Sequence, residues 1–418
     1  MDNGSSSKHQ NHNVPKIRFP GFEGEWERVK LSDYCDFLQG LTYKPEDVKK
    51  DGTLVLRSSN IQNSVLCFND NVYVSSDMIP SKISTKSNDV LMCVRNGSRN
   101  LVGKTALISQ RYAGLAWGAF MNILRPHKNN TFLYFFLNSR FFRNQIDADL
   151  DTATVKQITI GTLNGVEISI PHELEQEKIA TFLLLLDERI TKQRELIEKL
   201  KTYKRGALSV MFPQKGETVP RCRFASFSGE WEKRKLGEIV QFSKGSGYSK
   251  SDLKESGTPI ILYGRLYTKY ETVISNVDTY AEPKEGSVFS HGGEVIVPAS
   301  GETAEDISIA SVVEKSGFLL GGDLNIITPP RSLNSAFLAL SISYGNPHNE
   351  MAKMAQGKSV VHLHNSDLEK IVLLHPSIEE QTHICEYFQS LDNLISLHQR
   401  KLDLLIKTKQ SLLQQLFI

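Results

Sequence analysis

The sequence predicts a mixed α/β (α+β) protein made of two tandem copies of one unit, separated by two long antiparallel coiled-coil helices that an internal pseudo-twofold axis relates. Three observations predict this fold. The chain of 418 residues repeats itself at an offset of 205. In each copy, strand-like apolar segments frame polar loops. Each copy then ends in a segment of about 40 residues whose apolar positions follow a coiled-coil spacing.

The repeat is clearest at the two ends of each copy. Residues 14–40 and 219–245 are identical at 13 of 27 positions. The same offset aligns the stretch that begins at Leu163 with the one that begins at Leu368, and each contains a strand-like segment that ends in proline. We therefore interpret the chain as one duplicated unit, in which only the middle of each copy has diverged.

A long helix is predicted after each of these prolines. Glu173 and Glu175 in the first copy, and Ser377 followed three residues later by Glu380 in the second, are helix-start signals. Spacings of three and four residues then predict one apolar seam on each helix. The seam residues are Leu183, Leu186, Ile190, Ile197, Leu200, Ala207 and Met211 in the first helix, and Phe388, Leu391, Ile395, Leu402, Leu405, Leu412 and Leu416 in the second.

Polar residues interrupt both seams at equivalent places. They are Gln193 and Lys204 in the first helix and His398 and Lys409 in the second, and such residues fix the register of coiled coils. We expect the helices to pair antiparallel and to act as a ruler of roughly 58 Å, which is about 17 base pairs of DNA. The carboxyl-terminal end should then finish beside the first copy. The alternative is two amphipathic helices that each cover their own domain.

The stretch VRNGSRNLVGKT, residues 94–105, resembles a nucleotide-binding phosphate loop because it ends in Gly-Lys-Thr. A phosphate loop has four residues between its first glycine and that Gly-Lys-Thr, whereas five separate Gly97 from Gly103. A helix should follow such a loop, but the TALIS that follows here is typical of a strand. The second copy has no Gly-Lys-Thr at the corresponding place, 294–313. These three differences argue against an ATPase.

The same loop predicts a recognition surface instead. Similar strands flank it in both copies, at 89–108 and 294–313, while the loop itself changes completely. Arg, Asn, Ser and Glu are side chains that read base edges in DNA. An ordinary solvated loop is the alternative. The candidate DNA-binding residues of the two loops are Arg95, Asn96, Ser98, Arg99, Asn100 and Lys104 in the first copy and Ser300, Glu302 and Thr303 in the second.

A second candidate segment follows an apolar run in each copy. It contains Arg57 and Asn60 within RSSNI in the first copy, and Arg265 within LYGRLY in the second. These side chains are suited to contact phosphates or bases. Hydrogen bonds within the fold explain the same residues equally well.

Composition and missing motifs narrow the function further. A net charge of +2 neither demands nor excludes nucleic acid. Five scattered cysteines without a C-x-x-C pair indicate reduced thiols in the cytoplasm, and no apolar run is long enough to span a membrane. Residues 1–13 are polar and predict a disordered tail. Neither copy holds a methyltransferase tetrad, a histidine metal motif or a nucleophile elbow, so we expect no catalytic, cofactor or metal site.

In combination these features resemble the specificity subunit of type I restriction-modification enzymes. The resemblance covers nearly the whole chain, from residue 14 to residue 418. Its motifs are specific together and weak one by one. They are the Trp-Glu-x-x-x-Leu starts at Trp26 and Trp231, the closing Leu-x-x-[Val/Ile]-x-[Ile/Leu]-x-x-Pro segments at 163–171 and 368–376, the Glu-Gln pairs at 175–176 and 380–381, and LDNLISLHQRKLDLL at 391–405.

The resemblance implies a domain order and a set of partners. Each target recognition domain is expected to read one half of a bipartite, asymmetric site in double-stranded DNA. Two methyltransferase subunits that bind S-adenosylmethionine and methylate adenine N6, and restriction subunits that use ATP and Mg²⁺, are the implied partners in phage defence. A two-headed coiled-coil adaptor for other proteins is the alternative. The implied domains are a first recognition domain at 14–172, a first spacer helix at 173–213, a second recognition domain at 214–377 and a second spacer helix at 378–418.

Overall fold

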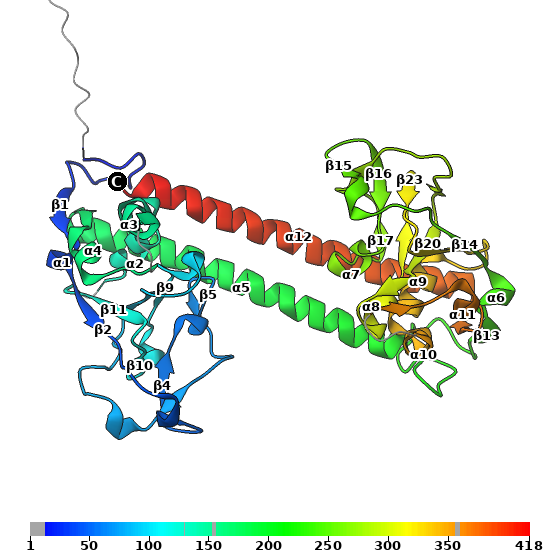
Figure 1. Ribbon diagram of the computed structural model, residues 1–418, viewed down its shortest axis with the longest axis horizontal. Helices are drawn as coiled ribbons and strands as arrows, with labels where there is room; N and C mark the ends of the chain where they lie inside the picture. Colours follow the sequence, from blue (N-terminus) through cyan, green and yellow to red (C-terminus); the bar gives the residue numbers. More distant parts are fainter. Residues whose placement is uncertain (1–12, 129, 153–155, 356–359) are drawn as a thin grey trace, which may run out of the picture. The chain divides into compact units, whose positions relative to one another are not determined.

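A computed structural model describes the chain over residues 13–128, 130–152, 156–355 and 360–418. The predicted tail at 1–13 lies outside these residues except for Asn13, whose carbonyl accepts a hydrogen bond from the Trp26 backbone (2.8 Å). The chain forms two compact units, which consist of the residues up to Arg194 with Arg400–Ile418, and of Glu195–Gln399. Each unit therefore contains one sheet-rich domain and part of both long helices (Figure 1).

The first unit is built around two small sheets. Its main elements are β1 (Glu27–Lys30), β2 (Cys35–Gln39), β3 (Val48–Lys49), β4 (Thr53–Leu56), β7 (Tyr73–Val74), β8 (Val90–Cys93), β9 (Thr105–Leu107), β10 (Ala116–Trp117), β11 (Met121–Pro126), α2 (Phe132–Leu137), α3 (Arg140–Thr152), α4 (Ile160–Gly165) and β12 (Glu167–Ile170). One sheet has the antiparallel order β2-β11-β8-β9, and the other has the order β10-β4-β7-β3. All four residues of β8 are buried because this strand lies inside its sheet with both faces covered.

The second unit repeats this plan. Its main elements are β13 (Glu232–Lys235), β14 (Gln241–Lys244), β15 (Leu253–Lys254), β16 (Thr258–Ile261), β17 (Val273–Ile274), β18 (Tyr280–Ala281), β19 (Phe289–His291), β20 (Glu294–Pro298), β22 (Ser311–Val313), β23 (Ser316–Leu320), β24 (Leu324–Thr328), α9 (Ser335–Tyr344), α10 (Asn346–Met354) and β26 (Val372–His375). The order β14-β24-β20-β22 corresponds to β2-β11-β8-β9 of the first unit. Buried Asn122 on β11 and buried Asn325 on β24 occupy equivalent places. The duplication is therefore visible in the strand order as well as in the sequence.

The first and last strands of each copy lie side by side. Strand β1 pairs antiparallel with β12, with Glu27 opposite Ile170, and β13 pairs with β26, with Glu232 opposite His375. The tryptophan of each start motif is buried beside this pair. The strands before and after each variable middle therefore pair with each other, and both lie in segments that the two copies share.

Two long helices are confirmed. They are α5 (Glu173–Met211) and α12 (Ile378–Leu416), each of 39 residues. In the first unit the early residue Leu183 of α5 shares a core with the late residue Leu416 of α12. In the second unit the late residue Leu208 of α5 shares a core with the early residue Phe388 of α12. The helices therefore pack antiparallel within each unit, as the seams predict (Figure 1).

The predicted seam residues are buried to different degrees. Near the sheet-rich domains the helices share large cores, whereas farther along only a narrow stripe of each helix is covered. The buried seam residues are Leu183, Ile190, Ile197, Met211, Phe388, Leu391, Leu402 and Leu416, and the half-buried ones are Leu186, Leu200, Ala207, Ile395, Leu405 and Leu412.

The polar lysines of the seam form equivalent ion pairs. The ammonium group of Lys409 lies 2.6 Å from the carboxylate of Asp187 in the first unit, and that of Lys204 lies 2.6 Å from Asp392 in the second. Both lysines are mostly buried, with 14% and 13% of the side chain exposed. A shift of one helix along the other would separate each lysine from its carboxylate, so these pairs favour one register.

A buried ion pair anchors the start of each long helix. The guanidinium of Arg18 donates two hydrogen bonds to Glu175, at 2.7 and 2.6 Å, and Arg223 donates two to Glu380, at 2.6 and 2.7 Å. Each arginine also donates to two backbone carbonyls just before its tryptophan motif. The glutamate of each Glu-Gln pair therefore holds the amino-terminal segment of its copy against the helix.

Candidate nucleic-acid interface

The loop between β8 and β9 carries the predicted reading residues of the first domain. A short turn of 3₁₀ helix occupies Arg99–Leu101, and β9 then begins at Thr105. Because a strand follows the Gly-Lys-Thr, no helix amino terminus is available there to hold a phosphate. Gly103 has a φ of +83°, and a side chain at this position would meet the guanidinium of Arg143 at 2.9 Å. The loop is therefore packed onto the domain by its own contacts, and the predicted strand is confirmed.

Arg95 and Asn96 connect this loop to two other segments. The guanidinium of Arg95, an exposed residue, lies over the ring of Phe120, 5.2 Å from its centre. The amide of Asn96 donates a hydrogen bond to the Ser58 hydroxyl (3.2 Å). The structure therefore brings together the two segments that the sequence singles out in the first copy, RSSNI and the glycine-rich loop.

The later residues of the loop differ in whether they contact the rest of the domain or face solvent. Arg99 forms an ion pair with Asp147 at 2.7 Å. Ser98 and Asn100 are exposed, and Lys104 is half-buried. Arg99 is therefore partly neutralised, while Ser98 and Asn100 face solvent.

Arg57 and Asn60 form one turn in which Asn60 has an internal role. Asn60 is fully buried, accepts a hydrogen bond from the Arg57 backbone (2.9 Å) and donates to the Cys67 carbonyl (2.9 Å). Arg57 is one-third exposed and lies 2.7 Å from Asp70. Asn60 thus shapes the turn, and Arg57 is the side chain of this segment that reaches the surface.

A recess opens beside these residues. Its volume is about 630 Å³. Phe120, which is 57% exposed, forms part of its wall. Sequence reasoning missed Phe120, because a phenylalanine within Trp-Gly-Ala-Phe-Met is typical of a core. A usable signal existed in the second copy, where the corresponding residue is Asp323. The recess is lined by Leu41, Thr42, Tyr43, Pro45, Val48, Arg57, Ser58, Ser59, Asp70, Val72, Gly118, Ala119, Phe120 and Met121.

The corresponding loop of the second domain is acidic, with Glu302, Glu305 and Asp306. It begins with β21 (Ser300–Gly301), which pairs with β25 (Val361–His362), and Ser300 is buried. The hydroxyl of Thr303 accepts the Asp306 backbone N–H (3.1 Å) and so caps α8 (Ala304–Ile307). Glu302 is exposed between these fixed points. Of the predicted residues Ser300, Glu302 and Thr303, Glu302 is the charged one, and its side chain is exposed to solvent.

Arg265 is held by two carboxylates. It begins α7 (Arg265–Thr268), only 9% of its side chain is exposed, and it pairs with Glu271 (2.7 Å) and Asp278 (2.8 Å). Burial raises the pKa of Tyr267 on the same helix, and the nearby charge of Glu302 raises it further. The helix that carries Arg265 therefore lies near the acidic loop.

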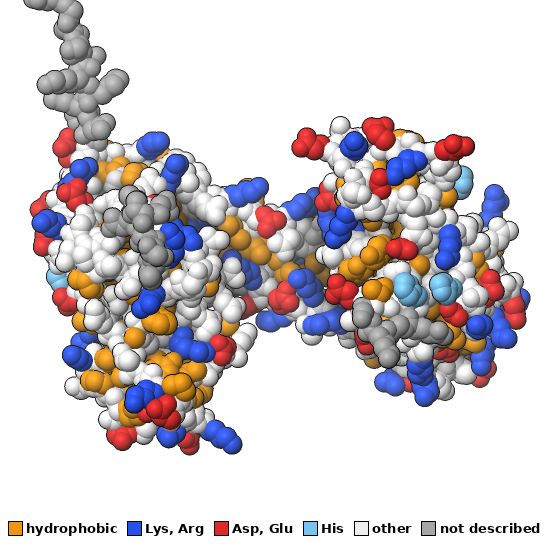
Figure 2. Space-filling model, in the orientation of Figure 1, with side chains coloured by type: hydrophobic (Ala, Val, Ile, Leu, Met, Phe, Trp, Pro, Cys, Tyr) orange, Lys and Arg blue, Asp and Glu red, His pale blue; other side chains and the backbone are white. Residues whose placement is uncertain are grey.

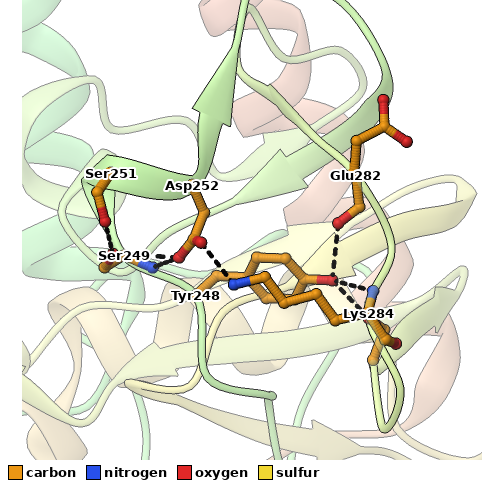
Figure 3. Close-up of polar contacts among 7 residues, drawn as sticks. Tyr248, Ser249, Ser251, Asp252, Glu282 and Lys284 are labelled. Carbon is orange, nitrogen blue, oxygen red and sulfur yellow. Dashed lines mark hydrogen bonds and ion pairs between the residues drawn. The ribbon is translucent and has the colours of Figure 1, made fainter.

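A polar cluster fixes the outer part of the second domain (Figure 3). The ammonium of Lys284 pairs with Asp252 (2.5 Å) and lies 4.9 Å from the ring centre of Tyr248. The hydrogen bond from Lys284, followed by that from the Ser249 backbone, lowers the pKa of Asp252 to about 2. The Tyr248 hydroxyl also bonds to the Glu282 carbonyl (3.2 Å). These contacts tie the segment before β15 to the loop after β18, so the cluster has a structural role.

Within the described part of the chain, no helix is long and apolar enough to cross a membrane, and no group of His, Cys, Asp and Glu is arranged to hold a metal ion. The five cysteines are free. Burial raises the pKa of the Cys93 thiol to about 11 and that of Cys385 to about 12. These two thiols are therefore packing groups rather than nucleophiles.

Comparison with known protein families and sequences gives one consistent result. Residues 23–202 and 228–407 each match the type I restriction modification DNA specificity domain. The chain is 22% identical over 389 residues to the EcoKI specificity subunit of Escherichia coli K12, covering 88% of this chain and 82% of that protein. It is also 26% identical over 226 residues to the StySPI specificity subunit of Salmonella potsdam. This match covers 51% of this chain and about half (48%) of that protein.

Among solved structures, the fold is similar to that of the type I restriction-modification S subunit of M. genitalium. The TM-score is 0.58 at 18% identity, over 97% of this chain and 99% of that one. At such low identity the likeness concerns the fold. The family match is independent of it and covers both copies, including most of each long helix. The chain therefore belongs to the specificity subunits of type I restriction-modification enzymes, with the specificity domain present twice.

Proposed function

We propose that each recognition domain reads one half of a bipartite, asymmetric site in double-stranded DNA. The observation that carries this proposal is that equivalent strand pairs, β8 with β9 and β20 with β22, frame loops of opposite chemistry. The first loop presents Arg95 and Asn100 at the surface, and the second presents Glu302. Arginine suits guanine, asparagine suits adenine and glutamate suits cytosine. Loops of such different chemistry select different half-sites.

The chemistry then comes from partner subunits. We expect two methyltransferase subunits that bind S-adenosylmethionine and methylate adenine N6, together with restriction subunits that use ATP and Mg²⁺, all acting on DNA in the cytoplasm against phage. The net charge of +2 is low for a protein that alone neutralises many phosphates. Sharing the phosphate contacts among several subunits accounts for this low charge.

Exposed apolar side chains on the long helices support the docking of these partners. On α5, Leu185 is 56% exposed, and on α12 Leu397 and Leu404 are 55% and 65% exposed. Leu397 and Leu404 are seven residues apart and therefore share one face of α12. Figure 2 shows apolar side chains at the surface of the helices. Such surface marks protein-binding sites, and each of the two long helices carries some of it.

Leu397→Asp is expected to weaken the binding of a methyltransferase subunit roughly thirtyfold, because burying one leucine stabilises a complex by about 2 kcal/mol. Ser396→Asp is the matched control, since Ser396 is exposed on a neighbouring face and receives the same charge. Titration calorimetry with the full chain measures both affinities. Equal affinities for the two variants would contradict docking on this face.

The proposed function is tested by mapping methylated adenines in the genome of cells that express a methyltransferase subunit with and without this chain. A split motif that appears only with the chain is the expected result, because the chain supplies the sequence preference. An active methyltransferase that produces no such motif in either strain would leave the protein adaptor as the better account.

A further inference from the structure

Phe120 stands at the surface of the first recognition domain on an ordered backbone. The residue is 57% exposed. Its carbonyl accepts hydrogen bonds from the backbone of Val94 (3.0 Å) and Arg95 (3.3 Å), both at the start of the loop between β8 and β9. The backbone of Phe120 is therefore held beside that loop by hydrogen bonds, which places its exposed ring there.

The surroundings of Phe120 suit an apolar group that is attached to a negatively charged polymer. The Arg95 guanidinium covers one side of the ring at 5.2 Å. Tyr43 and Met121 line the recess beside the ring, and Arg57 lies at the same recess. A methyl group that enters would meet the apolar side chains of Tyr43 and Met121, and the phosphates that accompany it would meet Arg95 and an Arg57 that pairs with Asp70.

The second copy shows that this position varies with the domain. The Ala299 backbone donates to the Asp323 carbonyl at 2.8 Å, as the Val94 backbone donates to the Phe120 carbonyl at 3.0 Å. The local sequences are Leu-Gly-Gly-Asp-Leu and Trp-Gly-Ala-Phe-Met. One backbone position thus presents an exposed ring in one domain and an exposed carboxylate in the other. A core position would not accept both, whereas a reading position differs when the bases differ.

We propose that Phe120 reads the C5-methyl group of a thymine in the half-site of the first domain. The inference rests on the proposed function, in which each domain reads one half-site. Phenylalanine makes apolar contact with the thymine methyl in the major groove, and acidic side chains accept from the cytosine amino group. Phe120 and Asp323 are then the same reading position with two chemistries.

The test removes the methyl group from the DNA. The target of the complex between this chain and its methyltransferase subunit is determined first, and each thymine in both halves is then replaced, one at a time, by deoxyuridine. For the wild-type complex, one replacement should weaken binding about fourfold, the ratio that corresponds to burying one methyl-sized group. The other replacements should have little effect.

Variants of the chain assign that methyl contact to Phe120. The Phe120→Ala complex should bind the thymine and deoxyuridine forms equally, and Phe120→Tyr, which keeps the ring, should restore the difference. Asp323→Ala should weaken binding through the second half-site and keep the fourfold difference. Because Phe120 is exposed, none of these changes removes a buried group.

Three results would overturn the inference. The wild-type complex could bind every deoxyuridine form as tightly as the thymine form, the Phe120→Ala complex could show the same fourfold loss as the wild type, or the target could lack thymine on both strands of both halves. The proposed function fails in a different way. A wild-type complex without any sequence preference would refute the reading of half-sites itself, before any thymine is replaced.

Discussion

Arg18→Ala is expected to lower the free energy of unfolding of the first unit by about 3 kcal/mol. The change leaves Glu175, whose side chain is fully buried, without its cation. Removal of one partner from a buried ion pair costs about 3–5 kcal/mol, because the remaining carboxylate is held away from water. The lower end applies because 15% of the Arg18 side chain is exposed, so water already screens part of the interaction. Hydrogen exchange in increasing urea, read by mass spectrometry, reports each unit separately.

Two further variants serve as comparisons for Arg18→Ala. Arg223→Ala removes the equivalent partner of Glu380 and should destabilise the second unit by a similar amount. Lys201→Ala removes an exposed pair with Glu198 and should cost less than about 0.5 kcal/mol. If Arg18→Ala cost no more than Lys201→Ala, the buried pair would not anchor the helix.

Removing seven residues from both long helices is expected to abolish methylation of the natural target. Deletion of 191–197 from α5 and of the equivalent 396–402 from α12 preserves the heptad register and keeps both lysine ion pairs. Seven residues correspond to about 10 Å of helix, or about three base pairs of DNA. If the helices set the spacer, the preferred target keeps both half-sites and has a spacer shorter by about three base pairs.

A DNA library that combines the two half-sites with every spacer from zero to twelve base pairs, methylated in vitro, measures the preferred spacing. The control deletes 191–197 alone, which puts the two seams out of step and should remove all specific methylation. Retention of the natural spacer by the paired deletion would show that something other than the helices determines the spacing.

The duplication and the long helices could be predicted because both are periodic. The offset of 205 is read directly from shared residues, and the seam follows from the repeat of the α-helix. Lys204 and Lys409 were predicted as register-fixing residues, and each has a repeat-equivalent aspartate as its partner. Patterns of this kind depend only on neighbours along the chain, so one sequence suffices to find them.

Contacts between distant residues could not be predicted in the same way. Arg18 and Glu175 are 157 residues apart, and nothing in the spacing links them. Asn60 has the side chain of a base reader, but the turn buries it. Phe120 has the side chain of a core residue, but the turn exposes it. The assignment of reading residues from the sequence stays a prediction, since exposure depends on the path of the backbone.

The pairing of β1 with β12, and of β13 with β26, has a consequence for how the gene can change. Each variable middle begins and ends at the same small sheet, and the segments at its start, 14–40 and 219–245, are identical at 13 of 27 positions. Recombination at the shared stretches on both sides of a middle would exchange that middle as a whole. If each middle reads its own half-site, as proposed above, a lineage would acquire a new target in one genetic event, while the long helices stay unchanged.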